Sequence, residues 1–224
     1  MDIEKVIKKL KLLSNPKNVE GMARFGINPK YALGVNVPVL RKLAADIEKE
    51  LKNKSQEKHK LASKLWGSKI HEVRILASMI DVPELVTQKQ MDSWIKEFNS
   101  WDLCDQICMN LFDKTPFAFD KAAEWSKKHK EFEKRAGFAL MACLAWHDKN
   151  AADKKFLKFL PLIKNASKDK RNFVKKAVNW ALRQIGKRNQ NLKKTVIILA
   201  REIQKMDNKT ANWIAKDALK ELLK

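Results

Sequence analysis

Apolar residues recur along the chain at the spacing of one face of an α-helix, and no stretch shows the strict alternation of a half-buried strand. In the first such stretch, residues 3–13, they occupy positions 3, 6, 7, 10 and 13. Asn15-Pro16 then predicts the end of a helix, and Val37-Pro38 predicts the start of another. The same pattern predicts further helices at about 55–66, 70–80, 88–97, 101–112, 117–128, 132–146, 151–163, 171–186, 190–205 and 208–223. The fold class predicted is all-α.

Three of the predicted helices share one pattern, which indicates an internal repeat. Segments 72–77 (EVRILA), 133–139 (EKRAGFA) and 174–181 (VKKAVNWA) each place a basic residue at a helix start, before small and apolar residues. Arg74 and Arg135 are 61 residues apart, and Lys176 follows Arg135 by 41 residues. The predicted helix at 101–112 lies about midway between Arg74 and Arg135, which divides the longer interval into two repeats. A two-helix repeat of roughly 30–45 residues is typical of HEAT or armadillo solenoids. We therefore expect residues 1–224 to form a single HEAT-like domain, an α-solenoid whose second helices line a concave side. The alternative is an irregular all-α domain.

Composition supports helices and bounds the class of protein. Only 6 Gly and 6 Pro in 224 residues disfavour a sandwich or barrel, and 45% hydrophobic residues exclude a wholly disordered chain. No apolar run approaches a membrane span and the N-terminus has no signal-peptide pattern, so we expect a soluble, cytoplasmic protein, nucleoid-associated in a prokaryote. Cys104, Cys108 and Cys143 are too few and too far from the histidines for a zinc site, so we expect buried thiols and no metal.

The charge is large and unevenly distributed. The chain has 47 Lys+Arg against 26 Asp+Glu, a net charge of +21, and residues 151–205 hold 16 basic and three acidic residues, a net +13. A solvated surface or a lysine-rich source proteome would also give a basic chain. Because a balanced surface serves solubility equally well, the surplus favours a polyanion partner, and nucleic acid above all. An anionic membrane is less favoured, because the basic segments carry apolar stripes of the interior type.

The most pointed candidate chemistry lies in segment 100–106, SWDLCDQ. Asp102 suits the positive end of a helix, while Trp101 and Asp105 are spaced i, i+4, so an indole and a carboxylate share one face. Taken alone, a core tryptophan and a salt-bridge aspartate explain the pair. Arg135 and Trp180 also fall on second helices, however, so we expect all four side chains to project into one basic, concave groove. We expect the other tryptophans to be packing residues: Trp66, Trp94, Trp125, Trp146 and Trp213.

The same segments carry a resemblance to a known family. SWDxxD at 100–105, KRA at 134–136 and KKAVNWALR at 175–183 resemble motifs of the AlkD-like DNA alkylation-repair family, and LGVNVPxxR at 33–41 is similar to its N-terminal segment. The resemblance runs in order over nearly the whole chain. It implies a HEAT-like fold and a DNA glycosylase that excises cationic alkylated purines, chiefly 7-methylguanine and 3-methyladenine, from double-stranded DNA in base excision repair. It implies no cofactor, and we expect a monomer.

By this resemblance, Trp101, Asp105, Arg135 and Trp180 fall on the family's functional positions. Asp105 would be the catalytic carboxylate, stabilising the developing sugar oxocarbenium and directing a water. The two tryptophans would hold the cationic lesion nucleotide and Arg135 a phosphate. We expect further phosphate contacts from the basic residues of the third segment, Lys175, Lys176 and Arg183. We expect no general acid, because none of the four histidines falls within these motifs.

A second class of function stays open. HEAT-like arrays are commonly scaffolds, and this chain would then bind nucleic acid or an acidic protein without chemistry. The family resembled here also includes DNA-binding branches that lack the catalytic aspartate. Asp105 favours the active branch, because a pure polyanion binder gains nothing from a carboxylate that faces its ligand.

Overall fold

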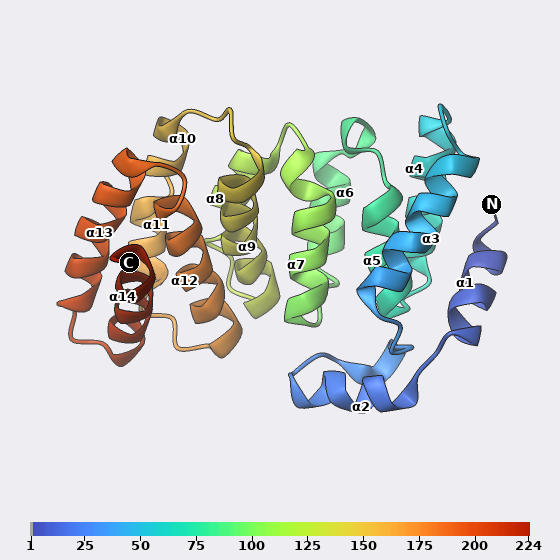
Figure 1. Cartoon of the computed structure of the whole chain (residues 1–224), viewed down its shortest axis with the longest axis horizontal. Coiled ribbons are helices and arrows are strands. Elements are labelled where there is room, and N and C mark those ends of the chain that lie inside the picture. The colour runs from blue at the N-terminus through green and yellow to red at the C-terminus, as the bar shows by residue number, and fades with distance from the viewer. Residues whose placement is uncertain (1) are drawn as a thin grey trace. The chain divides into compact units, whose positions relative to one another are not determined.

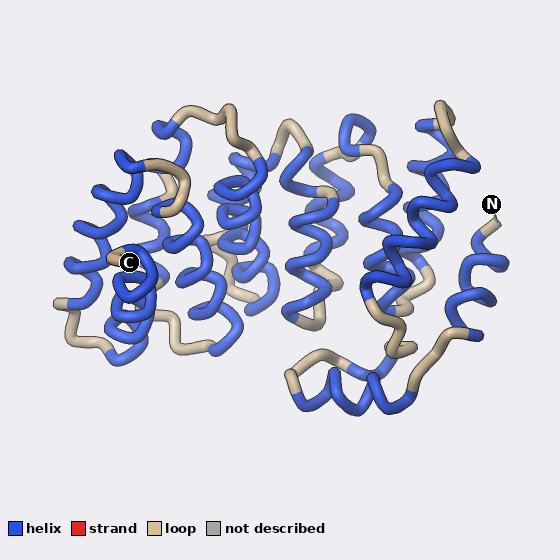
Figure 2. Tube along the Cα trace, in the orientation of Figure 1, coloured by secondary structure: helices blue, strands red, loops and turns tan. Residues whose placement is uncertain are grey.

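A computed structural model describes residues 2–224, and every regular element in that range is a helix (Figures 1 and 2). The chain divides into two compact units, Met1–Thr115 and Pro116–Lys224. The boundary coincides with Thr115-Pro116, where the sequence predicts a break between helices. We describe each unit on its own.

Unit 1 is built on α5 (His71–Ile80), which is buried along nearly its whole length. The helices α3 (Val37–Glu50), α4 (Ser55–Gly67) and α7 (Trp101–Asn110) pack against it. The remaining elements of the unit are α1 (Ile3–Leu12), α2 (Pro16–Arg24), α6 (Gln88–Ile95) and the short 3₁₀ turns η1 (Pro29–Tyr31), η2 (Pro83–Leu85) and η3 (Phe112–Lys114). The polar side chains that α5 buries, His71, Glu72 and Arg74, each have a hydrogen-bond partner within the unit, which allows this helix to take the central position.

Aromatic packing closes the core of unit 1. The rings of Trp66 and Trp94 stack with centroids 4.0 Å apart and planes 1° from parallel. The Arg74 guanidinium lies 4.5 Å from the Trp66 ring centroid and donates through Nε to the Trp66 carbonyl oxygen at 3.1 Å. A second guanidinium nitrogen of Arg74 pairs with Glu97. A buried arginine thus ties the end of α4 to the segment after α6.

Unit 2 is built on α9 (Glu131–His147), buried without interruption from Arg135 to Ala145. It packs against α8 (Ala118–Trp125) and most extensively against α12 (Asn172–Gly186), which also contacts α11 (Leu160–Ala166), α13 (Gln190–Gln204) and α14 (Lys209–Leu222). The short α10 (Asp153–Leu157) precedes α11. Gly137 permits the close approach of α8, because a Cβ there would lie 2.3 Å from the backbone nitrogen of Ser126.

Most predicted helices are present within a few residues of their expected bounds, but α2 was not predicted and one predicted helix was wrong. Asn15-Pro16 ends one helix but also begins α2, since Asn15 caps it by accepting from the Asn18 N–H at 3.3 Å and Pro16 takes the first position. The helix expected at 151–163 is two helices, α10 and α11. Pro161 cannot donate to the carbonyl four residues earlier and its ring crowds it, which breaks the helix there.

Candidate functional site

The helix α7 carries the first two predicted site residues. It begins at Trp101, and Ser100, fully buried and extended, is its N-cap residue. Trp101 and Asp105 are both half-buried and stand one turn apart on the helix, as the i, i+4 spacing predicts. Leu103, Cys104 and Ile107 on the opposite side face the core. The sequence therefore splits α7 into an apolar side and a side that bears an indole and a carboxylate.

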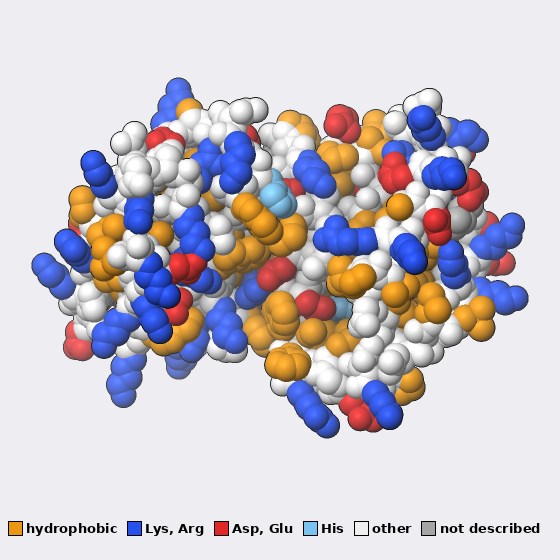
Figure 3. All heavy atoms as spheres, viewed as in Figure 1, with side chains coloured by type: hydrophobic (Ala, Val, Ile, Leu, Met, Phe, Trp, Pro, Cys, Tyr) orange, Lys and Arg blue, Asp and Glu red, His pale blue; other side chains and the backbone are white. Residues whose placement is uncertain are grey.

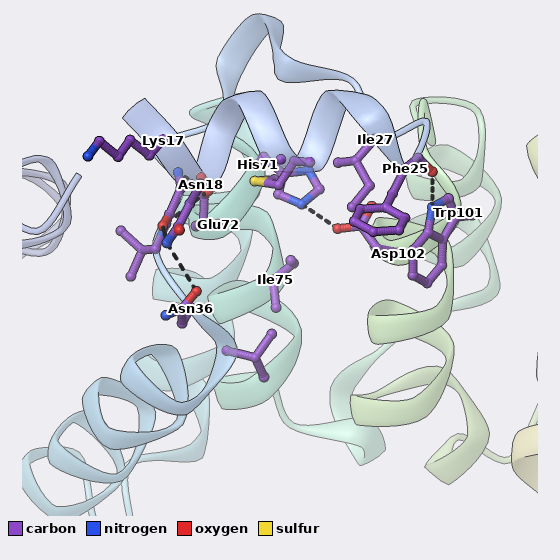
Figure 4. Close-up of a pocket in the computed structure, with 15 residues that line it drawn as sticks. Lys17, Asn18, Phe25, Ile27, Asn36, His71, Glu72, Ile75, Trp101 and Asp102 are labelled. Carbon is purple, nitrogen blue, oxygen red and sulfur yellow. Dashed lines mark hydrogen bonds and ion pairs between the residues drawn. The ribbon is translucent and has the colours of Figure 1, made fainter. Parts of the chain in front are cut away.

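The indole of Trp101 is held at its edge by the N-terminal part of unit 1. Its Nε1 donates to the carbonyl oxygen of Phe25 at 3.0 Å, and Phe25 ends α2. Figure 4 shows the Phe25 and Trp101 side chains close together at one end of a cavity (Figure 4). The hydrogen bond uses the indole N–H and fixes this edge of the ring against the end of α2.

That cavity, of about 520 Å³, lies wholly within unit 1. Its walls come from α2, the segment 34–37, the start of α5 and the start of α7, and they are mostly apolar with a few polar groups. The lining residues that matter to the site are Asn18, Asn36, His71, Glu72, Trp101 and Asp102. Asp105 is not among the residues that line it.

His71 and Asp102 form a buried pair at the junction of α5 and α7. His71 Nε2 lies 2.8 Å from Asp102 Oδ2, and the two side chains are 5% and 17% exposed. Burial works against charge on His71, but the hydrogen bond and the charge of Asp102, with Glu72 adding to them, raise the net pKa of His71 above its usual value. Burial likewise opposes charge on Asp102, and His71 outweighs it, so the pKa of Asp102 is lowered.

This pair is a contact that the sequence analysis did not predict. No histidine falls inside the motifs, yet the fold brings His71 into hydrogen-bond contact with the middle residue of the SWD segment. Asp102 is therefore more than a first-turn acid at the positive helix end. The only signal in the sequence is that His71 and Asp102 stand in the first turns of successive second helices, which a two-helix repeat places side by side.

Glu72, the neighbour of His71, fixes the segment 33–35. Its carboxylate is 1% exposed and accepts from the backbone N–H groups of Leu33, Gly34 and Val35 at 2.8, 2.7 and 3.3 Å. Gly34 has φ +75°, and a Cβ there would lie 2.2 Å from the carbonyl oxygen of Asn15. The LGVN motif thus has a structural explanation: it is the backbone turn that receives Glu72 and joins α2 to α5.

Arg135 lies in unit 2, in the second turn of α9, and it is 5% exposed. Its Nη1 donates to the carbonyl oxygen of Phe173 at 2.5 Å, at the start of α12. The adjacent Lys134 pairs with Asp169 at 2.9 Å, and Arg171 pairs with the same carboxylate at 2.5 Å. The hydrogen bond from Arg171, helped by Lys134, holds the pKa of Asp169 well below its usual range. Arg135 therefore belongs to a network that joins α9 to the start of α12.

The remaining predicted site residues lie along α12. Trp180 is half-buried, Lys176 is exposed, and Lys175 Nζ lies 5.0 Å from the ring centroid of Trp213 on α14. Arg183 pairs with Glu221 through Nη1, and its Nε lies 3.7 Å from Asp217. Arg183 is thus paired with two carboxylates of α14, whereas Lys176 lies at the surface.

The prediction for the tryptophans was right for three and wrong for two. Trp66, Trp94 and Trp125 are 5%, 5% and 0% exposed and pack in the cores. Trp146 and Trp213 are 49% and 41% exposed. Trp146 continues the buried side of α9 but stands in its last turn, where the helix runs out to the surface. Trp213 lies on the polar side of α14, with Lys209 one turn before it and Asp217 one turn after it. The three cysteines are buried and free of disulfides, as predicted.

Figure 3 shows lysine and arginine side chains spread over the surface of α12–α14, with few acidic side chains among them (Figure 3). The exposed lysines of this basic segment include Lys168, Lys170, Lys187 and Lys194. Within residues 2–224, no helix has the length and apolarity needed to cross a membrane. In the same range, no group of three or more His, Cys, Asp or Glu side chains is placed to hold a metal ion.

The four residues predicted to share one groove fall on second helices, two in each unit. Trp101 and Asp105 share a side of α7 in unit 1, while Arg135 and Trp180 belong to α9 and α12 in unit 2. The structure brings Trp101 together with Asp102, His71 and Phe25. The common groove itself stays a prediction from the sequence.

Comparison with known proteins gives the fold and the family. A solved structure described as "a new family of proteins related to the HEAT-like repeat DNA glycosylases with affinity for branched DNA structures" matches with a TM-score of 0.74 and 20% identity. The match covers 100% of this chain and 96% of that one, which confirms the predicted all-α, HEAT-like repeat fold. No curated protein sequence matches the chain significantly. The model of the DNA alkylation repair enzyme family matches residues 6–222. The chain therefore belongs to the DNA alkylation repair enzyme family.

Proposed function

We propose that the protein is a DNA glycosylase that hydrolyses the N-glycosidic bond of cationic alkylated purines, 7-methylguanine and 3-methyladenine, in double-stranded DNA, and that it acts as a monomer without a cofactor. The observation that carries the proposal is the indole–carboxylate pair on α7. Trp101 and Asp105 stand one turn apart on the side of the helix away from the core, in a chain of the DNA alkylation repair family.

The chemistry needed for these lesions is modest. Alkylation at N7 or N3 makes the purine cationic, so its bond to the sugar is already weakened and the leaving base needs no protonation. What remains is to stabilise the oxocarbenium character of the sugar and to direct a water to it. A carboxylate performs both tasks, by its charge and as a base. We assign this role to Asp105.

The other predicted residues serve binding in this proposal. Trp101, with its N–H committed to Phe25, offers ring faces to a cationic lesion nucleotide, and Trp180 offers a second half-buried indole. A cation–π contact of this kind contributes roughly 1–2 kcal/mol. Arg135 supplies a fixed guanidinium for a phosphate, and Lys175 and Lys176 add positive charge along α12. Arg183 would contact a phosphate by exchanging its pairing with Glu221.

A second candidate function is DNA binding without excision. It is favoured by the net charge of +13 over residues 151–205 and by the structural neighbour, which is described as having affinity for branched DNA. The two candidates differ in one measurable property, which is whether a base leaves the DNA.

The deciding experiment measures release of 7-methylguanine from methylated duplex DNA by the native protein and by Asp105→Asn. We expect release above the spontaneous rate, and a loss of about 100-fold or more in Asp105→Asn. Affinity for DNA should be unchanged or higher in that variant, since a negative charge near phosphates is removed. Glu84→Gln, which removes an exposed carboxylate of η2 in the same unit, is the matched control and should excise normally.

Circular dichroism must show that both variants keep their helices. Native protein that binds DNA but releases no base would establish the second candidate. Asp105→Asn with native excision would show that the carboxylate is only structural.

A further inference from the structure

A second cavity, of about 350 Å³, lies within unit 2 at the end of α9. Its walls are the last turn of α9, the loop that follows, and the C-terminal half and end of α12. The residues that line it are Ala145, Trp146, Lys149, Trp180, Gln184, Lys187 and Arg188. Two are tryptophans, three are basic and none is acidic, which is the chemistry of a site for an aromatic anion.

Trp146 is the unusual member of this set. It is 49% exposed, although an indole is the largest side chain and gains most from burial. One side of it is supported by His147, whose ring lies 5.0 Å away at an interplanar angle of 27°. The indole is therefore oriented by a stacked neighbour while remaining open to solvent. Trp180, which is half-buried on α12 and is assigned above to the lesion nucleotide, also lines this cavity, so the stacking test is made at Trp146.

The cavity wall is rigid because Arg188 holds it. The Arg188 guanidinium donates to four backbone carbonyl oxygens at the end of α9 and in the following loop, at 3.1, 2.7, 3.3 and 2.9 Å: Ala145, Asp148, Lys149 and Ala151. It also lies 4.1 Å from the Phe156 ring centroid. These bonds fix the loop that carries Lys149, so the position of Trp146 relative to Lys149 is set before any ligand arrives.

The cations at the edge of the cavity differ in availability. Lys149 is exposed, and Lys187 is exposed but paired with Glu221. The guanidinium of Arg188 already donates to backbone carbonyls, so it adds positive electrostatic potential to the cavity but does not form a bidentate hydrogen bond with a phosphate. Lys149 is thus the residue best placed to meet a phosphate.

We propose that this cavity binds one unpaired nucleotide of DNA, with its base stacked on Trp146 and its phosphate at Lys149. An indole stacks only on a base whose face is open, which excludes a paired base within an intact duplex. A cavity of about 350 Å³ falls within the range of small-molecule sites, roughly 300–1,000 Å³. The inference goes beyond excision, because it requires neither damage nor hydrolysis.

The test compares binding of two DNAs of equal length, a fully paired duplex and a duplex with a three-nucleotide thymine bulge. Trp146→Ala should lose about tenfold in affinity for the bulged DNA, in line with the effect of removing one stacking side chain, and should bind the paired duplex as the native protein does. Trp146→Phe should keep most of the affinity, because it keeps a ring. Tyr31→Ala is the control, since Tyr31 is also 49% exposed but lies in unit 1.

A fluorescence measurement makes the test independent of the stability of Trp146→Ala. Adding a thymidine pentanucleotide should quench the tryptophan emission of the native protein and quench Trp146→Phe clearly less. Equal affinity of native protein and Trp146→Ala for bulged DNA, equal losses on both DNAs, or unchanged quenching in Trp146→Phe would each overturn the proposal. Tighter binding of the matching oligoribonucleotide would assign the cavity to RNA and overturn it as well. None of these readouts depends on release of a base, so they remain separate from the fate of the glycosylase proposal.

Discussion

The His71–Asp102 pair allows a prediction about how α7 is held. Replacing His71 with alanine leaves the Asp102 carboxylate, 17% exposed, without its partner at 2.8 Å. Breaking a buried ion pair by removing one member costs about 3–5 kcal/mol. Because Asp102 retains some contact with solvent, we expect the lower end, about 3 kcal/mol in the free energy of unfolding.

The effect should depend on pH in a defined direction. The folded pKa of His71 is raised above 6.5, so its contribution is fully present below 6.5 and is lost as the pH rises through the folded value. The folded pKa of Asp102 is lowered below 3.8, so its contribution is present above 3.8 and is lost as the pH falls through the folded value. The ion pair therefore stabilises most between these limits.

The assay is a double-mutant cycle of urea unfolding with native protein, His71→Ala, Asp102→Asn and the double variant. We expect a coupling energy of about 1–3 kcal/mol at pH 5.5 and a clearly smaller one at pH 9, where a neutral imidazole keeps only the hydrogen bond. The cycle cancels contributions from outside the pair, including those of the second His–Asp pair of the unit, His59 with Asp81 at 2.6 Å. A coupling of zero, or one equal at both pH values, would refute the reasoning.

Two further predictions concern DNA and its lesions. Affinity for undamaged duplex should fall with salt at a log–log slope of about −0.9 per phosphate contacted, carried by exposed lysines such as Lys168, Lys170, Lys187 and Lys194. Titration by fluorescence anisotropy at several salt concentrations measures it, and salt-independent binding would remove the nucleic-acid interpretation. Single-turnover excision should be much slower for hypoxanthine or uracil than for 7-methylguanine, because a neutral base must be protonated before it leaves. The nearest candidate acid is His71, and its ring nitrogen that faces α7 is hydrogen-bonded to Asp102. Comparable rates would mean that the site holds a general acid, and His71→Gln would show whether it is His71.

The helices were predictable because their signals are local. An apolar residue at every third or fourth position is a property of a short window, and it placed α5, α7, α9 and α12 within a few residues. The exceptions have local causes as well. Asn15-Pro16 carries both a stop and a start signal, and Pro161 breaks a helix whose apolar period continues across it.

The candidate site was predictable only where it lies within one helix. Trp101 and Asp105 share a side of α7 because of their spacing, whereas His71 and Asp102 meet across two helices from positions 31 residues apart. The Glu72 carboxylate likewise reaches backbone groups 37 to 39 residues earlier. Such contacts follow from how helix pairs stack, which periodicity does not specify. The spacing of apolar residues also does not predict that a side chain at the end of a helix, such as Trp146, is exposed.

Arg74 and Arg135 occupy equivalent positions in two repeats, and comparing them shows what an Arg135 variant would test. Arg74 and Arg135 each lie two residues after a buried glutamate, in the first two turns of their helices, and both are 5% exposed. Arg74 ties α5 to Trp66 and Glu97, and Arg135 ties α9 to the carbonyl of Phe173. Arg135 therefore contributes to the packing of unit 2 whatever it does for DNA, since losing a buried charged donor costs about 1–3 kcal/mol. If an Arg135 variant lost excision, the loss could come from a less stable unit 2 or from a lost DNA contact, and the assay would not separate the two. Asp105→Asn changes a half-buried side chain with little change in its shape. The catalytic proposal is for this reason decided at Asp105, not at Arg135.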